Sequence, residues 1–523
     1  MASRRIQARA KWRDFRGTLR PVGAVLMGLA GAQAVCAGLG FIVERWVATP
    51  EERQPEDALW MLLSATLTAV TGLASFRYGK SHAKMNITRR EALFAVTLIW
   101  IVGGIFAGLP FMLSTARMGF VDAFFESVSG MTTTGATVIA DIDGELMKGQ
   151  PGRPGGLSHC VLLWRSLIQW LGGMGIVVLF VAVFPSLGAG AKHMFKGEVP
   201  GTTAEGLKPR IAETSFTLWK LYAAITAIET GLLIVLGMSP FDAVCHAFTT
   251  MSTGGFSTRD ASVAGWDSFA IETVVSTFML IGSLNYGLFY ALMRGKNARA
   301  VFRNTELRAF VFLSLILTIV LTIGILPQHD GDPVQAFRYA YFMVGTTMSS
   351  TGYGTDDYML YSQAMLMVIV LMMFIGGCSG STAGGLKVER VVLMAKTAWA
   401  EFRESFRPAV VHVVRMGKNA VPEGILRDVA VFFGVYMAVL GFGVLFVVAN
   451  ESLLYGWDCS VGTAFGATLS ALSNMGPAPW HDGPDNFVRY SHLSKLFFVF
   501  AMLLGRLEFF TMFALLVPDF WKR

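Results

Sequence analysis

Charged residues are scarce in this chain. Asp, Glu, Lys and Arg make up only 15% of its 523 residues, whereas hydrophobic residues make up 53% and the mean hydropathy is +0.52. A soluble domain carries about 25% charged residues, so the shortage excludes an ordinary soluble domain and indicates an integral membrane protein. Many apolar runs approach the roughly 20 residues that a helix needs to span a bilayer. They are too long for membrane β-strands, which need about 10 alternating residues.

Several kinds of functional site are also missing from the sequence. The five cysteines are odd in number and scattered, so they predict neither a metal motif nor a disulfide framework. The sequence shows no pairing of a nucleophile with a base and no obvious nucleotide-binding domain. We therefore expect neither an enzyme nor a cofactor in this chain.

The net charge of +7 is unevenly distributed. Basic residues gather at the N-terminus and in alternate connections between the apolar runs. This alternation follows the positive-inside rule and predicts that both termini lie in the cytoplasm. We attribute the charge to membrane orientation rather than to nucleic-acid binding. The first apolar run, 21–44, lacks a convincing cleavage site, so we interpret it as a retained helix and not as a signal peptide.

Ten spanning helices fit the charge pattern, in an all-α integral membrane fold. The first two form a pair without a glycine loop. The other eight form four pairs with one glycine loop between the members of each, which predicts four helix–loop–helix (M1–P–M2) repeats around a central pore. The predicted spans are 21–44, 57–76, 91–114, 158–185, 214–237, 267–292, 308–327, 362–394, 425–450 and 491–517. The predicted domains are a basic N-terminus at 1–20, the extra helix pair at 21–90, and repeats at 91–190, 214–295, 305–395 and 425–523.

The four loops look like copies of one another. Each has a glycine two residues after a hydroxyl or amide side chain. A ring of four such loops would replace the water shell of a potassium ion with backbone carbonyls, and glycine suits a backbone whose carbonyls must point inward. The predicted filter residues are Thr133, Thr134, Gly135, Ser252, Thr253, Gly254, Ser350, Thr351, Gly352, Asn474, Met475 and Gly476.

A short, mostly apolar segment precedes each loop. Such a segment is too short to span a bilayer, so we expect a half-helix whose carbonyl end faces the pore and favours a cation. A glycine turn that only caps a helix is the ordinary alternative for one loop, but four loops at equivalent positions disfavour it. The four segments are Val121–Met131, Pro240–Met251, Pro333–Met348 and Cys459–Leu472.

Acidic residues lie near the loops but not within them. We therefore expect carbonyl oxygens to select the ion. Asp260, Asp356 and Asp357 follow the second and third loops, where they either concentrate cations or are ordinary solvated carboxylates. We expect Glu126 to hydrogen-bond to backbone behind the first loop, and His246 to be structural.

The eighth span becomes rich in small residues after its apolar half. Each glycine inside a helix costs roughly 1 kcal/mol relative to alanine, so we expect a broken helix with an irregular loop. Such a loop is tolerated only where it is buried or lines a cavity, and beneath a filter it would obstruct the pore. The predicted gate residues in this span are Gly376, Gly377, Gly380, Ser381, Thr382, Gly384, Gly385 and Lys387.

Arg506, within the last predicted span, completes the predicted gate. An arginine at this depth costs at least ~2.5 kcal/mol unless it is paired or hydrated. It is either an electrostatic barrier to cations, an anchor for the gating loop, the ion-pair partner of Glu508, or a helix-capping residue. Lys387 could instead be an ordinary lysine that flanks the membrane on the cytoplasmic side. A phosphate-binding loop is disfavoured here because Leu386 separates Gly385 from Lys387.

These motifs together resemble the Trk/Ktr/HKT superfamily of potassium transporters, and most of all the bacterial TrkH-type membrane subunit. The resemblance extends from about residue 20 to the C-terminus, and the extra N-terminal helix pair favours the Trk branch. The segments that carry it are Phe125–Gly135, Gln169–Ile176, Thr249–Ser257, Ser349–Gly354, Gly376–Lys387 and Ser473–Pro477.

The resemblance implies that the carbonyls of the four loops bind K⁺ as the transported ion. In plant relatives, serine in place of the first filter glycine goes with sodium transport, so Gly135 favours potassium. The fourth loop departs most from the others, through Asn474, Met475 and Pro477, which implies a less sharp selectivity. The resemblance also implies a bacterial inner-membrane location, a homodimer, and a separate cytoplasmic nucleotide-binding subunit of the TrkA type.

Other interpretations stay open. Potassium uptake could be coupled to H⁺ or Na⁺ through the same filter, although no buried carboxylate clearly supplies a coupling site. A scaffold subunit could keep the fold without conducting. An intramembrane enzyme or a solute carrier would predict no four-fold glycine repeat. The basic connections 186–213, 294–307 and 388–424 are candidates for docking the regulatory subunit, and attraction to anionic lipid headgroups explains their charge equally well.

Overall fold

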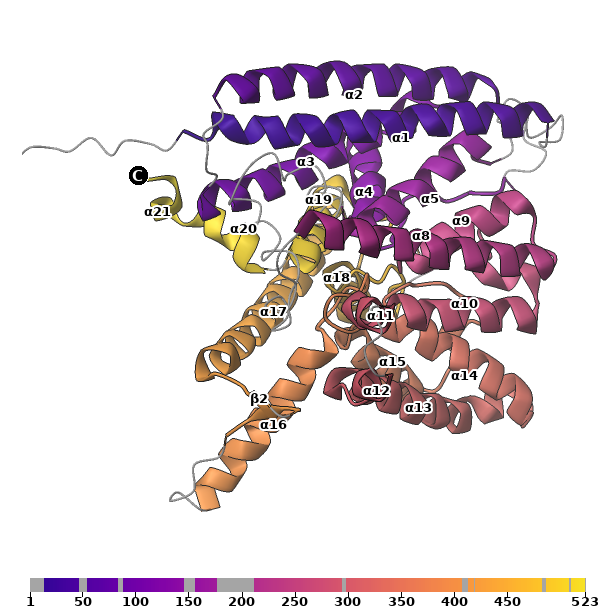
Figure 1. The fold of residues 1–523 in the computed structure, drawn as a ribbon. Coiled ribbons are helices and arrows are strands. Elements are labelled where there is room, and N and C mark those ends of the chain that lie inside the picture. The colour runs from indigo at the N-terminus through magenta and orange to yellow at the C-terminus, as the bar shows by residue number, and fades with distance from the viewer. Residues whose placement is uncertain are drawn as a thin grey trace, which may run out of the picture.

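The computed structural model describes residues 14–46, 54–82, 88–144, 156–175, 211–293, 298–406, 413–417, 419–481, 486–507 and 509–522. Within these ranges the protein is almost entirely helical. The exception is a small hairpin in which β1 (Arg415–Met416) pairs antiparallel with β2 (Asn419–Ala420). The predicted all-α class is confirmed, and Figure 1 shows the helices packed into one body with α16 projecting from it.

The N-terminal helix pair forms as predicted. Helices α1 (Leu19–Trp46) and α2 (Glu56–Ser81) lie side by side along their length (Figure 1). Glycines bring the two backbones together, because a Cβ atom at Gly79 would overlap the backbone of Arg20. Small residues at a helix–helix contact are the usual way to gain close packing in a membrane. Helix α1 also packs against α3 and α5.

The other helices form four sets, and the second helix of each set is the short helix of 12 to 16 residues that precedes a predicted filter loop. The first set is α3 (Arg89–Leu113), α4 (Phe120–Met131) and α5 (His159–Gly173). The second is α8 (Ile211–Val235), α9 (Pro240–Met251), α10 (Phe269–Gly282) and α11 (Tyr286–Met293). The third is α13 (Thr305–Ile325), α14 (Pro333–Met348), α15 (Gln363–Phe374) and α16 (Val388–Phe406). The fourth is α17 (Glu423–Ala449), α18 (Val461–Ser473), α19 (His492–Leu507) and α20 (Phe509–Leu516).

Further short helical pieces lie between or beside these helices. The α-helical ones are α12 (Ala298–Phe302) and α21 (Pro518–Trp521). A π-helical turn, η7 (Asn450–Leu454), follows α17. The 3₁₀ turns are η1 (Arg16–Thr18), η4 (Ser262–Trp266), η5 (Leu326–His329) and η6 (Tyr358–Leu360).

Six helices in the described ranges are individually long and apolar enough to cross a membrane, and the bent pair α10–α11 makes a seventh. The count of ten stays a prediction. The predicted span 267–292 is not one continuous helix, because the chain turns by 87° between α10 and α11. The turn has a physical cause. The Ser283 carbonyl accepts the Cys378 N–H, and the Tyr286 N–H donates to the Gly380 carbonyl, so the backbone serves the neighbouring loop instead of continuing the helix.

The predicted break in the eighth span is present. Helix α15 ends at Phe374, and α16 begins only at Val388 and runs to Phe406, beyond the predicted end at 394. The loop between them is closed at its base, where the Gly376 N–H donates to the Leu386 carbonyl over 2.7 Å. In the fourth and tenth predicted spans, residues 176–185 and Glu508 lie outside the described residues.

The interior is centred on the short helices and the loops that follow them. Every residue of α4 from Phe125 to Met131 is buried, including two serines and a glutamate. Outer helices instead expose large apolar side chains such as Leu59 and Ile323. Polar groups inside and apolar groups outside suit a chain whose solvent is lipid, because buried backbone and hydroxyl groups must find their partners within the protein.

Candidate functional site

The four short helices end in the same backbone turn. After each helix one non-glycine residue has a left-handed φ of 53° to 56°. The next residue donates its N–H to the carbonyl five positions earlier, over 2.8 to 3.0 Å. Left-handed non-glycine residues are uncommon, so four of them in one arrangement identify a shared local structure. The left-handed residues are Thr133, Thr253, Ser350 and Asn474.

This geometry corrects the register of the second loop by one residue. Thr253, not Ser252, is equivalent to Thr133, and Gly255, not Gly254, is equivalent to Gly135. Ser252 instead caps the end of α9. When the four loops are aligned by sequence, Gly254 is matched to Gly135. The backbone geometry shows that the next glycine, Gly255, occupies the equivalent position. The equivalent triplets are Thr133-Thr134-Gly135, Thr253-Gly254-Gly255, Ser350-Thr351-Gly352 and Asn474-Met475-Gly476.

The loops contact one another in a closed cycle. In three of the four contacts, a Cβ atom added to the glycine of one loop would overlap a carbonyl oxygen of the next loop. In the fourth it would lie 2.8 Å from that oxygen. The cycle runs from the first loop to the fourth and back to the first. The glycine–oxygen pairs are Gly135 with Gly254, Gly255 with Thr351, Gly352 with Met475, and Gly476 with Thr134.

The glycines let these carbonyl oxygens converge. All four glycines have positive φ, between 78° and 96°, where side chains are strained. The Thr351 oxygen also lies 3.5 Å from the Cβ position of Gly135, so oxygens of the second and third loops approach the same point of the first. A ring of converging carbonyl oxygens, reached by the carbonyl ends of four helices, is a cation-binding arrangement.

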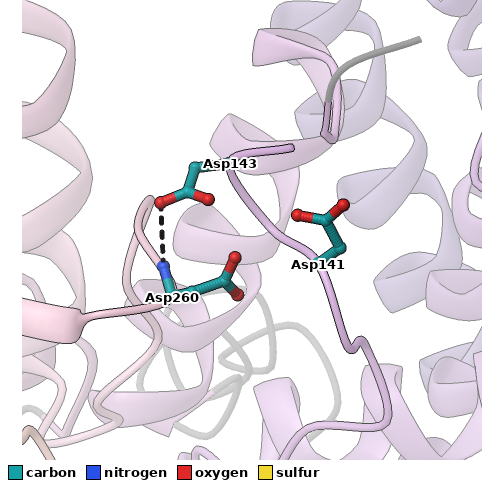
Figure 2. Close-up of side chains that lie close together, drawn as sticks. All are labelled: Asp141, Asp143 and Asp260. Atoms are coloured by element: carbon teal, nitrogen blue, oxygen red, sulfur yellow. Dashed lines mark hydrogen bonds between the residues drawn. The ribbon is translucent and has the colours of Figure 1, made fainter. Parts of the chain in front are cut away.

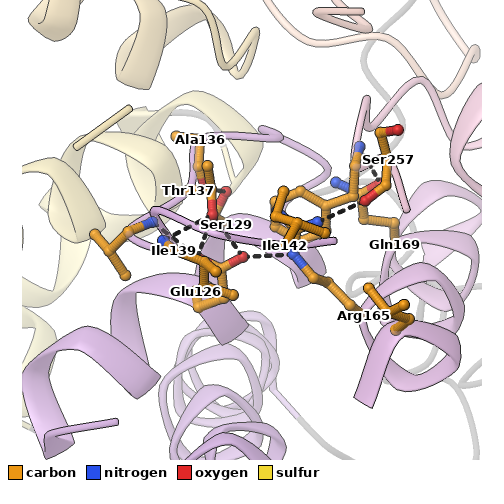
Figure 3. A network of polar contacts seen from close by, with 12 residues as sticks. Glu126, Ser129, Ala136, Thr137, Ile139, Ile142, Arg165, Gln169 and Ser257 are labelled. Atoms are coloured by element: carbon orange, nitrogen blue, oxygen red, sulfur yellow. Dashed lines mark hydrogen bonds and ion pairs between the residues drawn. The ribbon is translucent and has the colours of Figure 1, made fainter. Parts of the chain in front are cut away.

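A buried ion pair lies behind the first two loops (Figure 3). Arg165 on α5 donates its Nε–H to Glu126 on α4 over 2.7 Å, and neither side chain is more than 2% exposed. Arg165 also donates to the Ser257 carbonyl over 3.0 Å and stacks on Phe256. Glu126 accepts the backbone N–H of Val138 over 3.0 Å, as predicted. The ion pair therefore holds in place the segments that follow two neighbouring loops.

Gln169 clamps the second loop from the same helix. Its Nε2 donates to the Gly254 carbonyl over 2.7 Å, and its Oε1 accepts the Phe256 N–H over 3.1 Å. A carbonyl oxygen has two lone pairs, so Gly254 keeps one for another partner. Sequence reasoning missed both Arg165 and Gln169 as individual residues. Their i, i+4 spacing in an apolar helix places them on one face, which was the available signal.

Two further ion pairs join neighbouring sets. Lys495 on α19 donates to Asp122 on α4 over 2.7 Å, which links the fourth set to the first. Arg338 on α14 donates to Glu272 on α10 over 2.6 Å, which links the third set to the second. Both pairs lie toward the outer ends of the short helices, so they fix the spacing of the ring.

Other residues near the loops have structural partners. His246 bonds through Nε2 to the Ser257 hydroxyl over 3.1 Å, consistent with a structural role. Asp356 accepts the Tyr361 hydroxyl over 2.7 Å. Asp357 accepts the backbone N–H of Met359 over 3.0 Å. These hydrogen bonds give both aspartates a structural role that requires no bound ion.

Three aspartates gather beyond the first two loops (Figure 2). One carboxylate oxygen from each of Asp141, Asp143 and Asp260 lies within 4.8 Å of the others. Asp260 accepts the backbone N–H of Ile142 over 3.0 Å, so it also ties the two loop exits together. Burial and the neighbouring Asp143 raise the pKa of Asp260 to about 6. The cluster places negative charge on the segments that follow the first two loops.

The loop between α15 and α16 lies directly against the ring. The Thr382 hydroxyl donates to the Met251 carbonyl at the end of α9 over 3.1 Å. The Gly384 N–H donates to the Ser350 hydroxyl over 2.6 Å, and a Cβ at Gly384 would overlap the Ser473 carbonyl. The loop therefore touches the second, third and fourth sets where each short helix ends.

Arg506 connects this loop to the first set. Its Nη1 donates to the Thr382 carbonyl over 2.8 Å, and its Nη2 donates to the Gly172 and Gly173 carbonyls over 2.6 and 3.1 Å. The planar guanidinium suits such a two-sided contact. Of the roles predicted for Arg506, this geometry favours the anchor.

Lys387 and Glu306 hold the base of the same loop. Lys387 is only 8% exposed and donates to the Ala383 carbonyl, which favours a structural role within the loop over that of an ordinary flanking lysine. Glu306 on α13 accepts the Ser379 N–H over 2.5 Å, a contact that the sequence did not reveal.

The predicted small residues fit tight backbone turns. Gly380 and Gly385 have positive φ, and a Cβ at Gly376 or Gly377 would clash. Ser381 lies in the same turn.

Known proteins match nearly the whole chain. The family model for TrkH, a cation transport protein, matches residues 61–522. The Trk system potassium uptake protein TrkH of Salmonella typhimurium is 37% identical over 512 residues, which cover 97% of this chain and 99% of the relative. That of Escherichia coli K12 is 36% identical over 513 residues, with the same coverage. The crystal structure of the potassium transporter TrkH from Vibrio parahaemolyticus has a TM-score of 0.82 and 31% identity, and covers 98% of this chain and all of that chain.

Replacement of Glu126 by Gln tests the buried ion pair. Arg165 would then be a buried charge without its carboxylate, which costs about 3–5 kcal/mol. We expect a clearly lower thermal unfolding temperature of the purified protein in detergent. Asp519→Asn is the matched control, because its exposed pair with Lys522 is worth less than about 1 kcal/mol. Equal unfolding temperatures for the two variants would contradict a supporting role for the pair.

Proposed function

This chain belongs to the TrkH family of cation transport proteins, and we propose that it takes up potassium through a gated pore. The observation that carries the proposal is the closed cycle of glycine–carbonyl contacts among four loops. Carbonyl oxygens replace the water around a potassium ion without adding a net charge that would trap it. The names of the relatives, which specify potassium uptake, support the same ion.

The filter is assigned to the corrected triplets of the four loops. We place the ion among the carbonyls of Thr134, Gly254, Thr351 and Met475 and those of the residues next to them. The loops cannot collapse onto a smaller ion without moving the supports that brace them, among them Arg165. The fourth loop has no hydroxyl at any of its three positions, whereas each of the others has at least one, which supports a less sharp selectivity than a symmetric ring would have.

The loop between α15 and α16 is the proposed gate. It lies against the carbonyl ends of three short helices, and Arg506 ties it to the first set, so an ion that leaves the ring meets it next. Opening requires that the Arg506 contacts break or that α15 and α16 carry the loop aside. Thr382 is hydrogen-bonded both to Arg506 and to the end of α9, which is consistent with a closed conformation.

We propose the membrane arrangement that the charge pattern predicts. Ten spans, with four helix–loop–helix repeats at 91–190, 214–295, 305–395 and 425–523, would surround the pore. The N-terminal pair at 21–90 would lie outside the ring. Both termini would be cytoplasmic, the loops would face outward, and the chain would lie in the bacterial inner membrane.

A cytoplasmic TrkA-type subunit and a second copy of this chain are the proposed partners. Helix α16 projects from the body and continues directly from the gate (Figure 1), which makes it the best-placed surface for a subunit that controls opening. Of the basic connections proposed for docking, residues 186–210, 294–297, 407–412 and 418 lie outside the described residues.

Proton coupling has one structural candidate. Glu229 on α8 is fully buried, and neither carboxylate oxygen has a hydrogen-bond partner among the described residues. The nearby Thr250 hydroxyl, in the short helix α9, also lacks one. A carboxyl at this place could bind a proton beside the second loop, although it lies outside the ring itself. A flux measurement with and without a pH gradient separates coupled from uncoupled uptake.

Gly135→Ser tests the filter in liposomes that contain the purified protein. A side chain there meets both a positive φ and the Gly254 carbonyl, so it displaces an oxygen of the ring. We expect selective potassium flux from the parent protein. In the variant we expect the potassium-over-sodium flux ratio to fall about ten-fold, equivalent to ~1.4 kcal/mol.

Gly354→Ser is the control for that experiment. Gly354 lies two residues beyond the third loop glycine, and a Cβ there meets no atom within 4 Å. We expect its flux ratio to match the parent. An unchanged ratio in Gly135→Ser would contradict the filter assignment. Absence of flux from the parent, even with a TrkA-type subunit added, would favour the non-conducting scaffold.

Arg506→Gln and Arg506→Lys separate the two roles proposed for this arginine. If Arg506 anchors the loop, both variants lose the two-sided contact, and the charged hydrogen bonds lost are worth about 1.5–3 kcal/mol. Basal potassium flux without a partner should then rise about ten-fold in both. If the positive charge itself blocked the pore, Arg506→Lys would remain closed, and that result would contradict the anchor.

A further inference from the structure

A large cavity opens beside α11, α12 and α13, away from the ring. Its volume of about 830 Å³ is similar to that of sites that hold small molecules. Eleven of its thirteen lining side chains are aliphatic or aromatic, and the two exceptions are Thr305 and Arg308. An occupant must therefore be mostly hydrocarbon, with a polar end.

The cavity is open toward the surroundings of the protein. Phe302 and Phe312 line it and are 68% and 66% exposed. Residues of α11 form one wall of this space, and α11 takes this direction because the chain turns by 87° after α10. In a bilayer the exposed side of an outer helix faces lipid, so an acyl chain has direct access.

Positive charge lies at one edge of the cavity. Arg308 lines it, and Arg303 follows the short helix α12, whose residues Val301 and Phe302 form part of the wall. Both arginines are exposed, and neither has an ion-pair partner within the part of the chain that the structure describes. No acidic side chain lines the cavity. The positive-inside pattern places this edge at the cytoplasmic surface, where anionic lipid headgroups concentrate.

We propose that this cavity binds one anionic phospholipid of the inner leaflet. An acyl chain fills the apolar recess between α11 and α13, and the phosphate pairs with Arg308 and Arg303. Two features favour a phospholipid over a helix of another protein. The recess is lined almost entirely by apolar side chains with Arg308 as the one charged residue, and that positive charge complements a phosphate.

The cavity wall is continuous with the supports of the gate. Leu284 lines the cavity, and its neighbour Ser283 accepts the Cys378 N–H of the gating loop over 2.8 Å. On the opposite wall, Glu306 precedes the lining residue Leu307 and accepts the Ser379 N–H. A lipid that spaces α11 from α13 therefore sets the distance between two supports of the loop. This consequence for gating depends on the proposed function, whereas the lipid site itself does not.

Native mass spectrometry of the delipidated full-length protein tests the site. The protein is titrated with phosphatidylglycerol or with phosphatidylcholine of the same acyl chains. We expect phosphatidylglycerol to bind at least about five-fold more tightly, since each basic residue at the surface adds roughly that factor. Arg308→Gln should weaken the binding of phosphatidylglycerol about five-fold and leave the binding of phosphatidylcholine unchanged. Leu315→Trp, which fills the recess, should weaken the binding of both lipids.

Two matched variants control for general effects. Arg77→Gln removes an exposed arginine at the end of α2, and Ile319→Trp adds the same bulk one turn farther along α13, outside the cavity. Both should bind lipid like the parent.

Equal binding of the two lipids, or no effect of Arg308→Gln and Leu315→Trp, would overturn the proposal. A shift from dimer to monomer in Leu315→Trp with unchanged lipid binding would also overturn it and assign the cavity to a contact between copies. This experiment measures lipid binding and not ion flux. A negative result would therefore overturn the lipid site without bearing on the transport proposal.

Discussion

The structure depends on one steric constraint, the contact between a glycine of each loop and a carbonyl oxygen of the next. Any side chain at Gly135, Gly255 or Gly352 would occupy the space that this oxygen fills. Because the contacts close into a cycle, a change in one loop is transmitted to both neighbours. Four loops from distant parts of one chain thereby act as a single ring with carbonyl oxygens facing one another.

The rest of the molecule maintains that ring in a solvent that offers no hydrogen bonds. Hydroxyls, amides and ion pairs that would lie on the surface of a soluble protein are buried behind the loops, as in the Glu126–Arg165 pair and Gln169. The loop between α15 and α16 follows the same rule. It leaves helical geometry, and its backbone groups find partners in Ser283, Glu306 and Arg506. Because Arg506 also donates to the carbonyls at the end of α5, the helix that carries Arg165 and Gln169, this loop and the ring share one supporting helix.

The sequence predicted the features that depend on composition and repetition. Long apolar runs predicted the outer helices, and the recurring glycines predicted the loops and the break after Phe374. It could not predict features that depend on tertiary contacts. The doubled glycine at Gly254 and Gly255 concealed the register, which only the left-handed φ of Thr253 decides. The bend after α10 and the role of Glu306 arise from contacts with the loop between α15 and α16, which lies far away in sequence.

The most direct test is a crystal structure of the protein grown in rubidium, with the ion located by its anomalous scattering. We expect a peak on the axis of the ring, within coordination distance of carbonyl oxygens of Thr134, Gly254, Thr351 and Met475. Gly135→Ser should weaken that peak. A peak only among Asp141, Asp143 and Asp260, or a ring without an ion at saturating rubidium, would contradict the claim that the four loops bind the transported ion.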